Sequence, residues 1–237
     1  MVCSGDIIMS HIDDLSILEE KIGYKFKDIN LLEMALTHSS AANERKINKI
    51  ENYERIEFLG DAVLELVSSD FLYKENPDMK EGNLTKLRSS MVCEPALAYC
   101  ARLIEIEKFI RLGKGEENTG GRDRDSIIAD VMEAVIGAIY IDGGIAPAHD
   151  YIHKFVLSDL EDKILFYDSK TNLQELVQTD PNNEFEYILI GEKGPDHNKE
   201  FSVEAKLNGK VIGRGIGRTK KAAEQKAAYE ALKFLKK

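Results

Sequence analysis

The sequence predicts an α + (α+β) protein, with an all-helical domain at residues 11–165 and a small α-β-β-β-α domain at 169–237. Through the first range, apolar residues recur every three or four positions, the period of helices that bury one face. After residue 185 they alternate with polar residues, the period of half-buried strands. A chain of 237 residues with 43% hydrophobic content can bury two cores.

Helical spacing and boundary residues divide the first domain into seven predicted helices. Pro95 stands in a first turn, where its missing N–H costs nothing, and Asp142-Gly143-Gly144 ends another helix. A polar connection is expected at Asn43–Asn52. The predicted helices are Leu15–Ile22, Asp28–Thr37, Tyr53–Tyr73, Glu81–Ser90, Pro95–Leu103, Ser126–Tyr140 and Pro147–Ile164.

The second domain has strand signals between two helices. Asn208-Gly209 is a strong signal for a two-residue hairpin turn, and Thr219 suits the N-cap of the last helix. Glycines in the third strand permit either a close backbone approach or a bulge. The predicted elements are a helix at Asn172–Gln178, a first strand that begins at Phe185, a second strand that begins at Phe201, a third strand at Val211–Ile216, and a helix at Thr219–Leu235.

Charge is distributed unevenly along the chain, whose net charge is −10. Residues 169–237 carry 13 Lys and Arg against 10 Asp and Glu, whereas the rest carries 19 against 32. Polyanion binding depends on basic surface. The second domain is therefore the candidate surface for nucleic acid, and most of the acidic excess elsewhere is ordinary solvated charge.

The cysteines and the N-terminus bear on the compartment. Cys3, Cys93 and Cys100 are odd in number and lack paired spacing, so neither a disulfide partner nor a zinc site is expected. Residues 1–10 lack a basic region followed by an apolar run, and no run of about 18 apolar residues suggests a membrane span. We therefore expect a cytoplasmic protein without a membrane partner.

Two apolar helices carry acidic residues at helical spacing. Glu57 and Asp61 share one face of the third predicted helix, and Asp130 and Glu133 lie three positions apart on the sixth. Carboxylates in apolar surroundings are costly unless positive charge compensates them, and a hard divalent cation does so. The pattern predicts a Mg²⁺-dependent phosphodiesterase centre. The alternative, a solvated acidic face, would need a broader and more mixed polar surface.

Two other features near these helices are less specific. Lys114–Asp125 is rich in Gly, Asn, Thr and charge, which predicts a mobile loop beside the acidic site or a plain surface connection. If the segment is a mobile loop, Arg122 and Arg124 can contact phosphates. His38 has no acid placed in sequence to orient it, so we interpret it as a helix-terminal histidine outside catalysis.

The segment ERIEFLGDAVL, which begins at Glu54, resembles the signature of the ribonuclease III family, and DVMEA from Asp130 matches that family's second acidic motif. The resemblance implies Mg²⁺, for which Mn²⁺ can substitute, and implies that Glu54 orients its neighbours. It also implies the metal-binding set Glu57, Asp61, Asp130 and Glu133, with Asp61 and Glu133 catalytic.

The last residues resemble the double-stranded RNA-binding domain in three motifs: KTNLQE from Lys170, GPDHNKEF from Gly194, and Lys220-Lys221 at a helix start where free N–H groups favour phosphate. The resemblance implies a helix in one minor groove, a loop in the next and lysines on the phosphates between them. The implied RNA-binding residues are Thr171, Gln174, Glu175, Gln178, His197, Lys199, Lys220 and Lys221.

Together the two resemblances imply a homodimeric endoribonuclease specific for double-stranded RNA. Each subunit would cut one strand to leave a 5′-phosphate, a 3′-hydroxyl and a short 3′ overhang, in the processing of ribosomal RNA precursors, mRNA and tRNA. Two alternatives are a protein that binds duplex RNA without cutting it and a metal-dependent nuclease or phosphohydrolase for DNA or nucleotides. The intact acids oppose the first, and the absence of a His-Asp metallohydrolase pair opposes the second.

Overall fold

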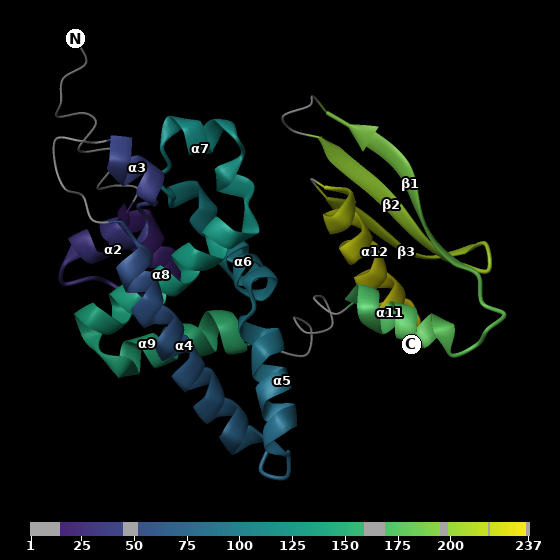
Figure 1. Cartoon of the computed structure of the whole chain (residues 1–237), viewed down its shortest axis with the longest axis horizontal. Coiled ribbons are helices and arrows are strands. Elements are labelled where there is room, and N and C mark those ends of the chain that lie inside the picture. The colour runs from purple at the N-terminus through teal and green to yellow at the C-terminus, as the bar shows by residue number, and fades with distance from the viewer. Residues whose placement is uncertain (1–14, 45–51, 159–168, 195–198, 218, 236–237) are drawn as a thin grey trace. The chain divides into compact units, whose positions relative to one another are not determined.

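The computed structural model describes residues 15–44, 52–158, 169–194, 199–217 and 219–235. The chain forms two compact units, Met1–Ser158 and Asp159–Lys237. The first is helical and the second contains a three-stranded sheet (Figure 1), as the sequence predicted. His197 and both ends of the predicted first domain, residues 11–14 and 159–165, lie outside the described residues.

The helical unit begins with a helix at residues 15–22. Pro95 occupies the first turn of its helix, as expected. The elements that follow are α2 (Ile29–Ala35), α3 (Ser39–Glu44), α4 (Glu54–Glu75), α5 (Glu81–Val92), α6 (Glu94–Leu103), the 3₁₀ turn η1 (Ile106–Phe109), α7 (Lys114–Asn118), the 3₁₀ turn η2 (Gly121–Asp123), α8 (Asp125–Gly143), α9 (Ile145–Ile152) and the π-helical turn η3 (His153–Leu157).

The core of this unit surrounds α8. Ile128, Val131, Met132, Val135 and Ile136 are all fully buried, so α8 has neighbours on nearly every side. The longest helix, α4, crosses it (Figure 1) and contributes buried apolar residues from one face. Because both acidic motifs belong to these two helices, the crossing decides where the acids meet.

Three expectations for the helical unit need correction. Lys114–Asp125 is not a loop, because α7 and η2 occupy most of it; Gly120, with φ of 79°, lets the chain turn between them. In the described part of the helix expected at Pro147–Ile164, α9 is followed by η3, after which Ser158 adopts an extended backbone; residues 159–164 lie outside the described residues. Finally, α3 takes up the first two residues of the connection expected at Asn43–Asn52.

The second unit has the predicted α-β-β-β-α order. Its elements are α11 (Ser169–Gln178), β1 (Phe185–Lys193), β2 (Glu200–Leu207), β3 (Lys210–Gly217) and α12 (Lys220–Leu235). The strands form an antiparallel sheet in the order β1-β2-β3. Residues of α11 and α12 share one core with inward-facing residues of the sheet, so both helices cover the same face (Figure 1).

Local sequence signals explain the turns and the close packing of this unit. Asn208 and Gly209 both have positive φ, as the predicted hairpin turn requires. The Thr219 side chain accepts a 3.1 Å hydrogen bond from the Ala222 amide and caps α12. A Cβ on Gly213 would lie only 2.6 Å from the backbone nitrogen of Ala231. The β3 glycine therefore serves the close approach of α12.

Within the described residues, no helix is both long and apolar enough to span a membrane. In the same part of the chain, Cys93 and Cys100 form no disulfide; the first is half-buried and the second is buried. Cys3 lies outside the described residues.

Candidate acidic active site

Two glycines bring the acidic helices together. A Cβ on Gly60 of α4 would overlap the carbonyl oxygen of Glu133 and lie 2.9 Å from the backbone nitrogen of Gly137 in α8. A Cβ on Gly137 would in turn overlap the carbonyl oxygen of Ile56. The two helix backbones are thus in direct contact, closer than helices with side chains at the crossing can approach.

This contact places the predicted acids beside one another. On α4, Glu57 and Asp61 lie on either side of Gly60 and one helical turn apart. On α8, Gly60 touches the backbone of Glu133, and Asp130 lies three residues before Glu133 on the same helix. Glu57, Asp130 and Glu133 are half-buried, whereas Asp61 is exposed. Four carboxylates that are far apart in sequence are therefore electrostatic neighbours.

Partial burial and neighbouring charges raise the pKa values of Glu57, Glu133 and Asp130. Burial, followed by repulsion from Asp130 and its α4 neighbours, raises the pKa of Glu57 to about 7. Burial and repulsion from Asp61, Glu57 and Asp130 raise the pKa of Glu133 to about 8. Burial also raises the pKa of Asp130. Each shift is the cost of gathering negative charge at a partly desolvated place.

The donor set suits a hard divalent cation. All four side chains supply carboxylate oxygens, the ligands that Mg²⁺ prefers, and none of the four forms an ion pair with a Lys, Arg or His in the described part of the chain. Over the same residues, no three His, Cys, Asp or Glu side chains are already placed to hold a metal ion. The carboxylates must therefore turn toward a shared ion to bind it.

Sequence reasoning missed Tyr53 as a neighbour of the site. Its hydroxyl donates a 3.2 Å hydrogen bond to Asp130 Oδ2, and its ring lies 5.7 Å, between centroids, from that of His38. Burial and the nearby Asp130 charge raise the tyrosine pKa. A signal was available, because Tyr53 precedes Glu57 by four residues and so lies on the acidic face of the same helical spiral.

The two arginines expected to be available to phosphates have internal partners. The Arg122 guanidinium donates to the Glu107 and Ile110 carbonyls at 2.7 and 2.9 Å and pairs with Glu117 at 2.6 Å. Arg124 pairs with Glu116 at 2.8 Å. These bonds connect η2 to α7 and to the backbone of residues 107–110.

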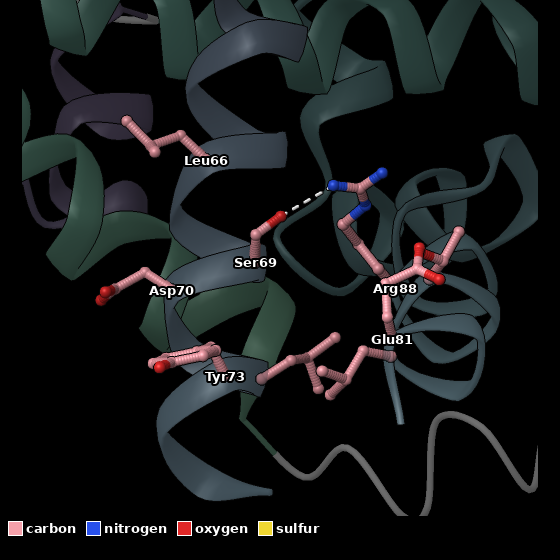
Figure 2. Close-up of a pocket in the computed structure, with 9 residues that line it drawn as sticks. Leu66, Ser69, Asp70, Tyr73, Glu81 and Arg88 are labelled. Atoms are coloured by element: carbon pink, nitrogen blue, oxygen red, sulfur yellow. Dashed lines mark hydrogen bonds between the residues drawn. The ribbon is translucent and has the colours of Figure 1, made fainter. Parts of the chain in front are cut away.

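A separate pocket of about 440 Å³ lies between α4 and α5. Figure 2 shows Arg88 of α5 reaching across to Ser69 of α4, to which it donates a 2.8 Å hydrogen bond. Leu66 and Tyr73 of α4 also line it. The acidic residues of the crossing are not among its lining residues, which all belong to the later part of α4 and to α5.

The predicted RNA-binding residues of the second unit fall into two groups. Those on α11 are all exposed and share one helix face at the spacing i, i+3, i+4, i+7; they are Thr171, Gln174, Glu175 and Gln178. In the second group, the Nζ atoms of Lys199 and Lys220 each lie 3.7 Å from a carboxylate oxygen of Glu192. Lys221 is exposed beside them at the start of α12.

Comparisons with known protein families match both units. Residues 28–160 match the family model described as ribonuclease-III-like, and residues 169–235 match the double-stranded RNA binding motif. The match to the second model covers every element from α11 to α12.

Individual relatives agree over nearly the whole chain. Ribonuclease 3 of Caldanaerobacter subterraneus is 51% identical, with 93% of this chain and 98% of the relative covered. Ribonuclease 3 of Listeria monocytogenes is 47% identical, with 92% and 96% covered. A solved nuclease domain of ribonuclease III from Campylobacter jejuni is 41% identical, covers 59% of this chain and 94% of its own, and superimposes with a TM-score of 0.55. The chain therefore belongs to the ribonuclease III family of double-strand-specific endoribonucleases.

Proposed function

We propose that this enzyme hydrolyses phosphodiester bonds of double-stranded RNA in a Mg²⁺-dependent reaction that leaves 5′-phosphate and 3′-hydroxyl ends. The observation that carries the proposal is the contact at Gly60, which gathers carboxylates of α4 and α8 that form no ion pair with a Lys, Arg or His among the described residues. In this proposal Glu57, Asp61, Asp130 and Glu133 hold the metal. Mn²⁺ would satisfy the same oxygen ligands.

The chain's own groups have distinct tasks in this proposal. When bound, a divalent cation supplies Lewis-acid activation of water and offsets charge on the phosphate. Asp61, the exposed member, and Glu133, whose pKa is raised to about 8 by burial and by the neighbouring carboxylates, are the catalytic pair that faces the reacting groups. Glu57 and Asp130 complete the ligand set from the half-buried side of the crossing.

Selection of duplex RNA is assigned to the second unit. The exposed face of α11 offers hydroxyl, amide and carboxylate groups to the 2′-hydroxyls of a minor groove. Lys199, Lys220 and Lys221 gather around Glu192 and the start of α12, where free N–H groups add to the attraction for phosphate. His197 belongs to the same proposal as a minor-groove contact. Recognition of A-form shape and of the 2′-hydroxyl excludes DNA.

We further propose a homodimer formed through the helical unit. Phe58, Leu66 and Tyr73 of α4 are 80%, 61% and 74% exposed and recur at seven- or eight-residue intervals, so they form one apolar stripe. The pocket between α4 and α5 continues this stripe. The similar nuclease domain from C. jejuni was described for flexibility in its region involved in dimer formation, which supports pairing here. Each subunit would then cut one strand.

The cellular role we propose is the processing of ribosomal RNA precursors, mRNA and tRNA in the cytoplasm. Its support is membership of the family together with a shape-reading RNA-binding unit, which suits structured precursors of many sequences.

The test uses end-labelled long duplex RNA with Mg²⁺ or with EDTA, beside matched duplex DNA and single-stranded RNA. Glu133→Gln should bind duplex RNA normally and lose cleavage, while Glu20→Gln, which removes an exposed carboxylate elsewhere, should cut at the normal rate. Direct ligation of the products without kinase treatment reports the 5′-phosphate. Mg²⁺-dependent cutting by Glu133→Gln would refute the site. Binding without cutting by the parent protein would favour the non-catalytic alternative.

A further inference from the structure

We propose that Tyr53 is a positioning residue for the acidic site, which orients the Asp130 carboxylate toward the metal by a hydrogen bond from its hydroxyl. The inference rests on the proposed function, because it acts through Asp130. It adds a residue that lies outside both acidic motifs and that holds the two acidic helices to one another.

The geometry of Tyr53 connects both helices through one side chain. The residue is 3% exposed and immediately precedes α4, where its carbonyl oxygen accepts hydrogen bonds from the Ile56 and Glu57 amides at 2.9 and 2.8 Å. Its hydroxyl reaches Asp130 Oδ2 on α8 at 3.2 Å. Tyr53 thus begins the helix that carries one half of the site and contacts a carboxylate of the other half.

A rigid support lies behind the tyrosine. The Tyr53 amide donates to the Thr37 carbonyl at 3.0 Å, and the backbone next to Thr37 exchanges bonds with Arg111: His38 N to Arg111 O at 3.0 Å and Arg111 N to Leu36 O at 2.8 Å. The residue is therefore held by its backbone as well as by its burial, and its hydroxyl has little freedom to leave Asp130.

His38 limits the movement of the ring. Its ring packs against the Tyr53 ring, and its Nδ1 accepts a 3.1 Å hydrogen bond from the Ser40 amide. Ser40 Oγ in turn accepts a 2.9 Å bond from the Gly113 amide. His38, which the sequence analysis interpreted as a helix-terminal histidine outside catalysis, is thus part of the support for Tyr53.

The chemical consequence follows from how a carboxylate binds a metal. A donor fixed on Oδ2 sets the rotation of the Asp130 carboxylate and leaves Oδ1 for a cation. Without that donor the rotation of the Asp130 carboxylate is no longer fixed. Loss of such outer hydrogen bonds costs roughly 10- to 100-fold in metal affinity or activity.

The experiment measures Mn²⁺ binding to the full-length, RNA-free protein by electron paramagnetic resonance, together with the Mg²⁺ concentration that gives half-maximal cleavage. Tyr53→Phe should weaken Mn²⁺ binding and raise the Mg²⁺ requirement by roughly tenfold, with most activity restored at saturating Mg²⁺. Tyr53→Met, which also lacks the donor, should shift both values in the same direction. Tyr140→Phe removes a hydroxyl from a partly exposed tyrosine of α8 and should leave both unchanged.

The outcomes separate this inference from the proposed function. If Tyr53→Phe lowers only the melting temperature and leaves both metal readouts within twofold of the parent, Tyr53 is merely structural and the inference is wrong. Asp130→Asn tests the site itself. Loss of Mn²⁺ binding in that variant supports the proposed function, whatever the Tyr53 variants show. Normal binding and cleavage by Asp130→Asn would overturn the proposed function and the inference together.

Discussion

Gly60 of α4 touches the backbone of Glu133 in α8, so that even one methyl group at position 60 would overlap the Glu133 carbonyl. The same carbonyl belongs to the residue whose carboxyl has a pKa of about 8. The close contact between α4 and α8 and the clustering of their acids therefore have the same cause: the absence of a side chain at Gly60 lets the two helices, and with them the acids, approach.

Gly60→Ala should destabilise the helical unit by about 3 kcal/mol or more and abolish cleavage, because the overlap is with backbone that cannot rotate away. Gly82→Ala is the matched control. A Cβ there meets nothing within 4 Å, and alanine is the better helix former by up to about 1 kcal/mol. Chemical denaturation and a duplex cleavage assay check both. A Gly60→Ala protein of parental stability would disprove the close crossing.

Glu133→Gln should change the pH dependence of stability measured in EDTA. The folded-state pKa is about 8, against an ordinary value of 4.5. The folded protein therefore binds more protons than the unfolded chain between these values, and stability falls as pH rises through this window. The glutamine variant lacks this loss.

The variant should thus match the parent below pH 4.5 and exceed it above pH 8, by on the order of 1–2 kcal/mol once solvent screening is allowed for. Melting temperatures across this pH range provide the measurement. Glu20→Gln, which alters an exposed side chain, should show the same dependence of melting temperature on pH as the parent. A Glu133→Gln advantage that grows toward low pH would contradict the assigned direction of the shift.

Replacing Lys220 and Lys221 together by alanine should weaken duplex RNA binding and reduce the salt slope by up to about 2, because two phosphate contacts are lost. The control removes equal charge elsewhere, through Lys210→Ala and Lys233→Ala, at exposed positions at the start of β3 and in the last turn of α12. Fluorescence anisotropy at several salt concentrations gives both slopes. Identical salt slopes in the two double variants would contradict a specific role in phosphate binding for the lysines at the start of α12.

Charged residues on the α4 stripe should disrupt the proposed dimer. Phe58→Glu and Leu66→Glu place a carboxylate where apolar surface is to be covered, which costs several kcal/mol on association. Leu103→Glu alters a side chain that is 60% exposed, like Leu66 at 61%, but that lies on α6. Sedimentation velocity should give the 26.7 kDa monomer for the first two variants and twice that mass for the control and the parent. A parent that sediments as a monomer would refute the proposal.

Local sequence patterns determined much of this protein. Apolar periodicity located the helices and strands, and the residues at their ends set several boundaries, as with Thr219 at α12 and Asn208-Gly209 between β2 and β3. Such signals act within a few residues, so they can be recognised without the fold. Acids at helical spacing in apolar helices likewise identified the candidate site residues.

Only the tertiary structure decided which groups meet across the chain. Arg122 pairs with Glu117 of α7 and donates to the Glu107 carbonyl of η1, contacts that the local sequence did not predict. Tyr53 reaches Asp130, 77 positions away. The touching of Gly60 and Glu133 depends on how two helices cross, which composition and spacing do not specify. Contacts of this kind arise from packing between segments distant in sequence, and their energies depend on the burial that the fold alone provides.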